Sequence, residues 1–300
     1  MSKLTLDYPV YSLDRHLLLP AGTALSEEDL HALISSSSAD YRKKIPLMQF
    51  GTVKKDILDF VRQPPGNAVF SNEEKLAEVI ELMEQVQLAQ PMLESIEYFK
   101  QYDSYTYRHS LMVFAYLTLL SKDLVPNYQV RIKEAATSPL HDFGKICVPL
   151  EILTKASPLT RDERKNVEHH TTAGYILLCY YSQNVDNIAA HVARDHHERK
   201  NGSGYPRGIS LNNRMVEIVA VCDIYDALIS QRPYRPVSFD NRTALEIITT
   251  MAERNEVSWE VLQALVAHNR KGNPHFTECI ISLDKRGIIS PNNVYGILAD

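Results

Sequence analysis

Residues 141–145 read His-Asp-Phe-Gly-Lys, so a histidine and an aspartate stand side by side at the point where a helical pattern stops. The apolar spacing of residues 130–140 predicts a helix before this pair. Gly144 marks the end of that helix and frees the backbone for a turn. A second pair, His196-His197, ends another predicted helix before a glycine-rich loop. Adjacent helical residues point roughly 100° apart, so each pair can address two ions, or one ion and its substrate.

Two further polar residues occupy positions where the helical pattern requires apolar side chains. His109 precedes Met112 and Val113 by three and four residues, which places it on the core face of its helix. Asp223 stands inside the apolar run 218–224. A buried carboxylate without a partner is strongly destabilising, so Asp223 must face a cation, a set of hydrogen-bond donors or a metal.

A single histidine on an apolar face is more often an ordinary core residue than a metal ligand. Five of the 11 histidines are left in that ordinary class: His16, His31, His191, His268 and His275. Seven nitrogen and oxygen ligand candidates, in contrast, are expected on the core faces of one helical bundle: His109, His141, Asp142, His170, His196, His197 and Asp223. Imidazole and carboxylate ligands without a thiolate favour iron, manganese or zinc, and two such ions are the usual clamp for phosphoester hydrolysis.

Composition limits the classes of protein to which the chain can belong. The 300 residues carry a formal net charge of −5, which argues against a DNA- or RNA-binding protein, because such proteins need clustered cations. We expect neither a signal peptide nor a membrane span, since no apolar stretch approaches the roughly 20 residues that a span requires. The four scattered cysteines indicate reduced thiols, and together these features predict a cytoplasmic protein.

The pattern of predicted secondary structure changes near the sequence Pro64-Pro65-Gly66-Asn67. Residues 1–70 are predicted to form a small N-terminal α/β module, with a capping box at Ser26–Asp29 that opens a short helix. Residues 71–270 show helical spacing almost throughout, which predicts a compact helical bundle. Residues 271–300 are expected to pack on the bundle as a tail, with 279–283 as a strand candidate. The predicted fold class is therefore mainly α, with a small α/β module at the N-terminus.

The quoted motifs also resemble a known family. Residues 141–145 match an HD-x-G-K signature, and residues 196–206, HHERKNGSGYP, are similar to the pattern HHExxDGxGYP with Asn201 where aspartate is usual. Residues 223–228 (DIYDAL) and 232–235 (RPYR) complete the pattern. Over roughly residues 101–265 the chain resembles the HD-GYP domain proteins, the bacterial cyclic-di-GMP phosphodiesterase branch of the HD superfamily.

The resemblance implies an HD-type helical bundle around a binuclear metal centre. It gives the role of metal ligands to the seven candidates above, with Asp142 bridging two divalent ions, iron or manganese first and zinc as the alternative. It also implies that a hydroxide bridging the metals attacks the phosphodiester. Some family members bind a third metal through a glutamate that corresponds to Tyr105 here, so two metals are expected. His169 directly precedes His170, the residue that matches the family ligand, and is therefore expected beside the site or on the surface and not as a ligand.

The resemblance further implies a substrate site beside the metals. Lys145 matches a position that contacts a phosphate oxygen, and Arg232 and Arg235 match positions that contact phosphate or guanine. Gly204 and Tyr205 belong to the loop that borders the substrate and, in some members, meets GGDEF-domain partners. A homodimer is a further expectation that is left open.

The function expected from this resemblance is hydrolysis of cyclic-di-GMP to linear pGpG, with onward hydrolysis to GMP left open. One alternative is a phosphodiesterase that prefers another cyclic dinucleotide, such as 3′,3′-cGAMP. A second is a non-catalytic cyclic-dinucleotide receptor or a scaffold for GGDEF proteins. The complete ligand set favours an enzyme, because buried polar groups destabilise a fold that binds no metal. A general HD nucleotide phosphohydrolase is disfavoured by the GYP loop and the Arg232/Arg235 pair.

Overall fold

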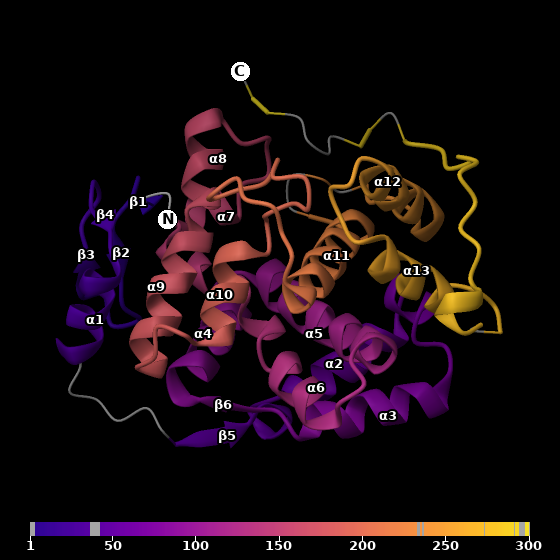
Figure 1. The fold of residues 1–300 in the computed structure, drawn as a ribbon, viewed down its shortest axis with the longest axis horizontal. Coiled ribbons are helices and arrows are strands. Elements are labelled where there is room, and N and C mark those ends of the chain that lie inside the picture. The colour runs from indigo at the N-terminus through magenta and orange to yellow at the C-terminus, as the bar shows by residue number, and fades with distance from the viewer. Residues whose placement is uncertain are drawn as a thin grey trace.

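The computed structural model describes residues 4–36, 43–232, 235, 237–272, 274–290, 292–293 and 298–299. Helices dominate this part of the chain (Figure 1). The α-helices are α1 (Glu27–Ser36), α2 (Val53–Arg62), α3 (Glu73–Glu84), α4 (Gln90–Tyr102), α5 (Ser104–Leu124), α6 (Tyr128–Ala135), α7 (Leu150–Leu153), α8 (Arg161–Glu168), α9 (His170–Ser182), α10 (Ile188–Asp195), α11 (Arg214–Ile229), α12 (Asn241–Glu253) and α13 (Trp259–His268). The mainly α class expected from the sequence is confirmed, with a helical bundle and a small strand-containing module at the N-terminus.

Helix α5 forms the centre of the bundle. Each residue from Leu111 to Leu117 is 0% exposed, because α2, α3, α4, α11 and α13 pack around it. Asp103 caps its N-terminus, since its side chain accepts a hydrogen bond from the amide of Thr106. Helix α11 is buried from Met215 to Ile229 and lies against α5. A helix that is apolar on every side needs such burial, and any polar residue on it must find a partner inside the protein.

The strands are short and paired two by two. Strand β1 (Leu4–Thr5) pairs antiparallel with β4 (Ala24–Leu25), and β2 (Val10–Tyr11) pairs with β3 (Leu17–Leu19). Together with α1 they form the module at the left of Figure 1, where α1 and β2 contact α9. Strand β5 (Lys44–Pro46) pairs antiparallel with β6 (Gln87–Ala89).

The pairing of β5 with β6 bears on the domain division. It joins residues on both sides of position 70, and α2 also packs on α5. Residues 44–62 thus contact the bundle directly. The division into 1–70, 71–270 and 271–300 stays a proposal. We propose to change its first boundary, so that of the described residues only 4–36 belong to the N-terminal module.

Two elements differ from the sequence-based expectation. The helix expected over residues 161–180 is divided into α8 and α9 at His169, which ends one helix and precedes the next. Residues 279–283 form no strand; at their start, Gln263 on α13 donates a side-chain hydrogen bond to the carbonyl of Cys279. Within the described residues, no helix combines the length and hydropathy needed to cross a membrane.

Glu134 on α6 allows the effect of burying a carboxyl group on stability to be tested. Burial raises the pKa of its carboxyl group to about 7, and its Oε2 atom has no hydrogen-bond partner. The folded state therefore binds more protons than the unfolded state between about pH 4.5 and pH 7, so stability falls as the pH rises through this window. We expect Glu134→Gln to raise Tm by roughly 2–4 °C at pH 8 and to change it little at pH 4.5.

The control for this experiment is Glu81→Gln, since Glu81 is exposed on α3. Thermal unfolding of the three proteins at both pH values separates burial from a general loss of negative charge. An equal effect of both substitutions at pH 8 would contradict this account of Glu134.

Candidate metal centre

The seven predicted ligands come from separate parts of the chain and meet inside the bundle. His109 lies on α5, His170 begins α9, and Asp223 lies on α11. The pair His141-Asp142 follows the short helical turn η3 (Ser138–Leu140), and the pair His196-His197 follows α10. All except His197 are buried, and His197 is partly exposed. The structure thus brings together the whole set that the sequence pattern singled out.

Backbone carbonyls fix the orientation of three imidazole rings. In each, Nδ1 donates a hydrogen bond to a carbonyl one turn earlier: His141 to Ser138 at 2.6 Å, His170 to Val167 at 2.5 Å and His196 to Ala193 at 2.9 Å. This bond requires the proton on Nδ1, so a neutral ring presents Nε2 as a lone pair. The three rings are therefore held in the tautomer that binds metals through Nε2.

The Nε2 atoms of these rings face one another at short distances. The Nε2 atoms of His141 and His109 are 3.3 Å apart, and so are those of His170 and His196. When the two facing Nε2 atoms both carry a lone pair, they repel each other unless a cation lies between them. The geometry and the donor set therefore fit a metal centre.

The cluster contains two groups of possible ligands that share no residue, and a third group, His141, Asp142 and His196, connects them. The potential ligand atoms of His109, His141 and Asp223 lie within 4.8 Å of one another, and the same holds for the group His170, His196 and His197. One carboxylate oxygen of Asp142, Oδ2, is 3.4 Å from Nε2 of His141, and the other, Oδ1, is 3.3 Å from Nε2 of His170. A carboxylate placed in this way can bridge two cations.

The electrostatics of the cluster keep four of its groups in the form that binds metals: His170, His196, Asp142 and Asp223. Burial lowers the pKa of His170 to about 4 and that of His196 to about 3, so both imidazoles are neutral at physiological pH. Burial alone would raise the pKa of Asp142, but the Lys145 ammonium and the neighbouring histidines hold it well below its usual range. The hydrogen bond from His109 likewise holds the pKa of Asp223 low. Neutral imidazoles and ionised carboxylates are the forms that bind metals.

Asp226 supports His109 and was not identified from the sequence. Nδ1 of His109 donates a hydrogen bond to Oδ2 of Asp226 at 2.8 Å, and the Arg108 guanidinium donates to the same carboxylate. Hydrogen bonds to Asp223 and Asp226, with the charges of the two carboxylates, raise the pKa of His109 to about 9 despite its burial. Without a metal this imidazole therefore carries a second proton, which metal binding would displace. The signal that could have found Asp226 is its place three residues after Asp223, on the same face of a buried helix.

Gly144 allows the His141-Asp142 turn to lie directly on α9. A Cβ atom at this position would be 1.9 Å from the carbonyl oxygen of His170 and 2.4 Å from the backbone nitrogen of Gly174. Both neighbours are backbone atoms, so the turn or the helix would have to shift. Glycine is therefore required for the approach of the two ligand segments.

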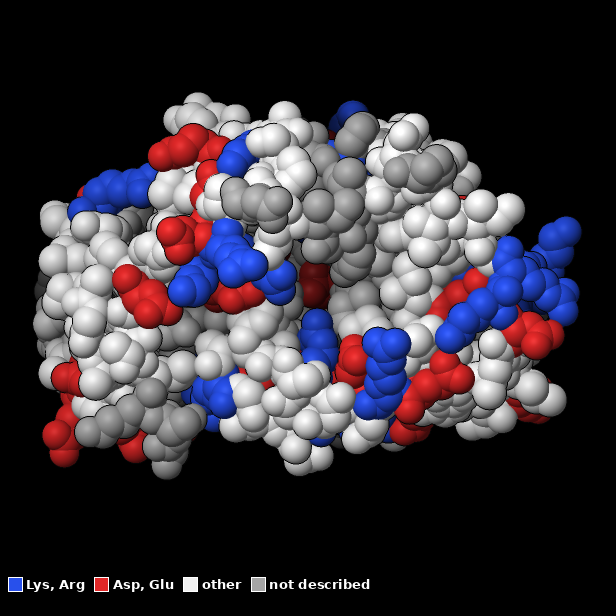
Figure 2. Space-filling view, turned by 90° about the horizontal axis from the view of Figure 1, so that it is seen from above, with Lys and Arg blue, Asp and Glu red and all other residues white. Residues whose placement is uncertain are grey.

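Lys145 and Arg232 lie beside the metal cluster. Nζ of Lys145 is 2.6 Å from Oδ2 of Asp142, and the Arg232 guanidinium lies over the ring of Tyr105, which is itself stacked on His109. A cavity of about 1030 Å³ reaches Tyr105, Arg108 and Arg232. Figure 2 shows a hollow on the upper face of the molecule, with acidic atoms deep inside it and basic side chains around it.

The glycine-rich loop is held close to the cluster. A Cβ atom on Gly204 would be 2.3 Å from the carbonyl oxygen of His197, and the ring of Tyr205 stacks on that of His197 with centroids 4.6 Å apart. Buried Glu198, which was also not identified from the sequence, accepts hydrogen bonds from the amides of Arg207 and Ile209. The signal that could have found Glu198 is its place directly after the two histidines of the quoted motif.

Asn201 and Arg235 both have structural roles here. The amide nitrogen of Asn201 donates to the carbonyl of Arg254 at 3.1 Å, a bond that an aspartate could not donate. The Arg235 guanidinium, expected to contact substrate, is buried and donates to three carbonyls at the end of α11, those of Ala227, Leu228 and Ser230. These hydrogen bonds give Arg235 a structural role, and its contact with substrate stays a prediction.

His169 and His191 lie outside the cluster. His169 is buried with its ring near that of Tyr8, and burial lowers its pKa to about 4. His191 accepts a hydrogen bond from Arg194. Neither belongs to the groups that can hold a metal within the described part of the chain.

Gly144→Ala tests whether the close approach of the turn to α9 builds the cluster. We expect a loss of about 1–3 kcal/mol in the free energy of unfolding, because the new Cβ meets backbone. The matched control is Gly174→Ala, whose Cβ would be 3.2 Å from its nearest neighbours and would gain helix propensity. Urea unfolding measures both, and an equal loss in the two variants would contradict this role of Gly144.

Comparison with known proteins agrees with the geometry of the site. A family model described as HD domain matches residues 82–257. The chain is 33% identical over 239 residues to the cyclic di-GMP phosphodiesterase PA4108 of Pseudomonas aeruginosa, a match that covers 79% of this chain and 53% of that protein. It is 45% identical over 109 residues to the cyclic di-GMP phosphodiesterase response regulator RpfG of Xanthomonas campestris, covering 36% of this chain and 29% of that protein.

A further relative carries a different specificity in its name. The 3′3′-cGAMP-specific phosphodiesterase 1 of Vibrio cholerae is 36% identical over 137 residues, which cover 44% of this chain and 30% of that protein. The matched regions thus span about half or less of these relatives' own length. The family match covers more than half of the chain and includes all seven clustered residues. The chain belongs to the HD domain family and carries the motifs of its HD-GYP branch.

Proposed function

We propose that the chain is a metal-dependent phosphodiesterase that hydrolyses cyclic-di-GMP to linear pGpG. The observation that carries this proposal is the Asp142 carboxylate, which lies between two groups of inward-facing histidines. The names of the relatives support the substrate class. In the reaction, water adds to one phosphodiester, the bond from phosphorus to the 3′ oxygen breaks, and that oxygen takes up a proton.

Two divalent cations would be held by the two groups of ligands, with Asp142 shared between them. When bound, they would supply the Lewis acidity that activates water and neutralises charge at the phosphate. The donor set contains nitrogen and oxygen only, which favours iron or manganese, with zinc as the alternative. The number and identity of the ions are part of the proposal.

Side chains of the protein would orient the substrate. Lys145 lies against Asp142 and has Nζ in reach of a phosphate oxygen placed at the cluster. Arg232 lies at the cavity that reaches Tyr105, where a guanidinium can bind phosphate in a bidentate manner or stack on a base. Tyr205 and Gly204 would form the border of the substrate site, although one face of the Tyr205 ring is already covered by His197.

A second candidate substrate is 3′,3′-cGAMP, because one group of relatives is named for it. A non-catalytic receptor is less well supported, since the buried cluster retains every ligand type that the chemistry requires. GGDEF-domain partners at the GYP loop, a homodimer and a cytoplasmic location all stay predictions. The packing of residues 271–300 on the bundle stays a proposal as well.

Substitution of Asp142 tests the proposed chemistry. We expect Asp142→Asn, which keeps the shape of the side chain, to lower turnover of cyclic-di-GMP at least about 10²-fold, because a neutral amide cannot bridge two cations. Product formation by the manganese-loaded protein is measured by chromatography. His16→Gln is the control, since His16 is exposed and remote from the cluster in the sequence. Full activity in Asp142→Asn would refute the assigned role.

Removal of metal tests the site without reference to activity. A ligand that binds only the folded state at 100 times its Kd adds about 2.7 kcal/mol of stability. We therefore expect chelation to lower Tm by several degrees and manganese to restore it, with no such response in Asp142→Asn. A Tm that is indifferent to chelator and metal in both proteins would exclude a metal centre here.

A further inference from the structure

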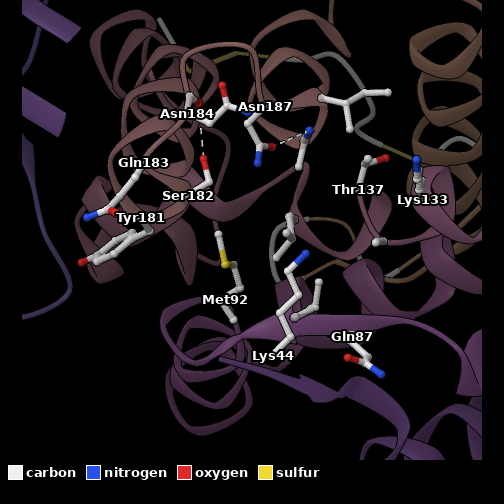
Figure 3. A pocket seen from close by; sticks show the side chains of 16 residues that line it. Lys44, Gln87, Met92, Lys133, Thr137, Tyr181, Ser182, Gln183, Asn184 and Asn187 are labelled. Atoms are coloured by element: carbon white, nitrogen blue, oxygen red, sulfur yellow. Dashed lines mark hydrogen bonds between the residues drawn. The ribbon is translucent and has the colours of Figure 1, made fainter. Parts of the chain in front are cut away.

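A second cavity lies away from the seven clustered residues. Its volume is about 490 Å³, within the range of roughly 300–1,000 Å³ that small-molecule sites occupy. Figure 3 shows it between strands β5 and β6 and the segment that connects α9 to α10, with α6 at its side. None of the seven predicted metal ligands lines it. The proposed phosphodiester chemistry therefore makes no use of this cavity.

The inner wall of the cavity is apolar and firmly held. Met92, Leu140 and Ala189 line it and are each less than 10% exposed. They belong to α4, η3 and α10, so the wall is built from three separately packed elements. A ligand in this cavity would place an apolar body against these side chains.

The rim of the cavity offers hydrogen-bond donors and positive charge. Lys44 on β5 and Lys133 on α6 line it from two sides, and neither ammonium forms an ion pair within the described part of the chain. Oδ1 of Asn187 accepts hydrogen bonds from the amides of Ala189 and Ala190, so its amide nitrogen remains as a donor. In Figure 3, Lys44 and Asn187 extend toward the cavity from opposite walls. Among the described residues that line the cavity there is no aspartate or glutamate, which favours an anion.

One wall of the cavity is formed by a chain segment that continues directly to a predicted metal ligand. Thr137 and Leu140 line it, and the turn η3 between them continues into His141. The same turn orients the imidazole, because Nδ1 of His141 donates to the carbonyl of Ser138 at 2.6 Å. A ligand that packs on Leu140 therefore contacts the segment that positions a predicted metal ligand.

We propose that this cavity binds a small amphipathic carboxylate and that, through the turn shared with His141, its binding is coupled to metal binding at the cluster. The carboxylate lies among Lys44, Lys133 and Asn187, and the apolar body lies against Met92, Leu140 and Ala189. A metal bound through His141 and a ligand packed on Leu140 hold the same turn, so each restricts the motion that the turn retains before the other binds. Coupling of this kind is reciprocal, so each ligand raises the affinity for the other.

Calorimetric titration of the full chain with decanoate tests the site. We expect saturable binding, weakened at least about tenfold when both Lys44→Gln and Lys133→Gln are present, because two charge-assisted contacts are lost. The matched control is Lys43→Gln, which removes a neighbouring exposed lysine that does not line the cavity. Decylamine, with the same apolar chain and the opposite charge, should not bind. The absence of decanoate binding, equal weakening by the control, or equal binding of decylamine would each overturn the site.

The same titration with and without manganese tests the coupling. We expect the Kd for decanoate to be at least about fivefold lower in the manganese-loaded protein than after chelation. An unchanged Kd would overturn the coupling. The lysine variants are compared in metal-free protein as well, so a failure of the proposed phosphodiesterase activity does not affect the test of the cavity.

Discussion

The structure depends on the balance of charge around the Asp142 carboxylate. Two ionised aspartates and five histidines face one another in the interior, and two pairs of Nε2 atoms approach to 3.3 Å. Such a cluster is costly in a protein interior unless positive charge compensates it. Lys145 supplies one charge, and the proposed cations would supply the rest.

The surrounding fold holds the cluster in place before any ligand arrives. Carbonyls one turn earlier fix three of the imidazoles, and Asp226 with Arg108 fixes the fourth, His109. Helices α5 and α11 are buried along most of their length, so their polar residues need partners inside the protein. Gly144 lets the His141-Asp142 turn lie against α9 without a gap. Rigid support of this kind is what a catalytic metal centre requires.

The sequence allowed the bundle and the cluster to be predicted because a polar residue inside an apolar helical pattern must find a buried partner. His109 and Asp223 are the plainest examples. Asp226 was not predicted because its partners lie on another helix, and spacing along one helix does not show which side chains meet across two. Glu198 was not predicted because its partners are backbone amides. Arg235 was expected in a polar loop, where burial cannot be inferred from spacing. The break at His169 was not predicted because neither a proline nor a glycine at that point marks the end of a helix.

Asp142 is proposed to lie between two bound cations. Anomalous diffraction at the manganese edge, from crystals of the manganese-loaded protein, tests it most directly. Two peaks are expected, one among His109, His141 and Asp223 and one among His170, His196 and His197, with a carboxylate oxygen of Asp142 directed at each. A single peak, or peaks outside these two groups, would contradict it.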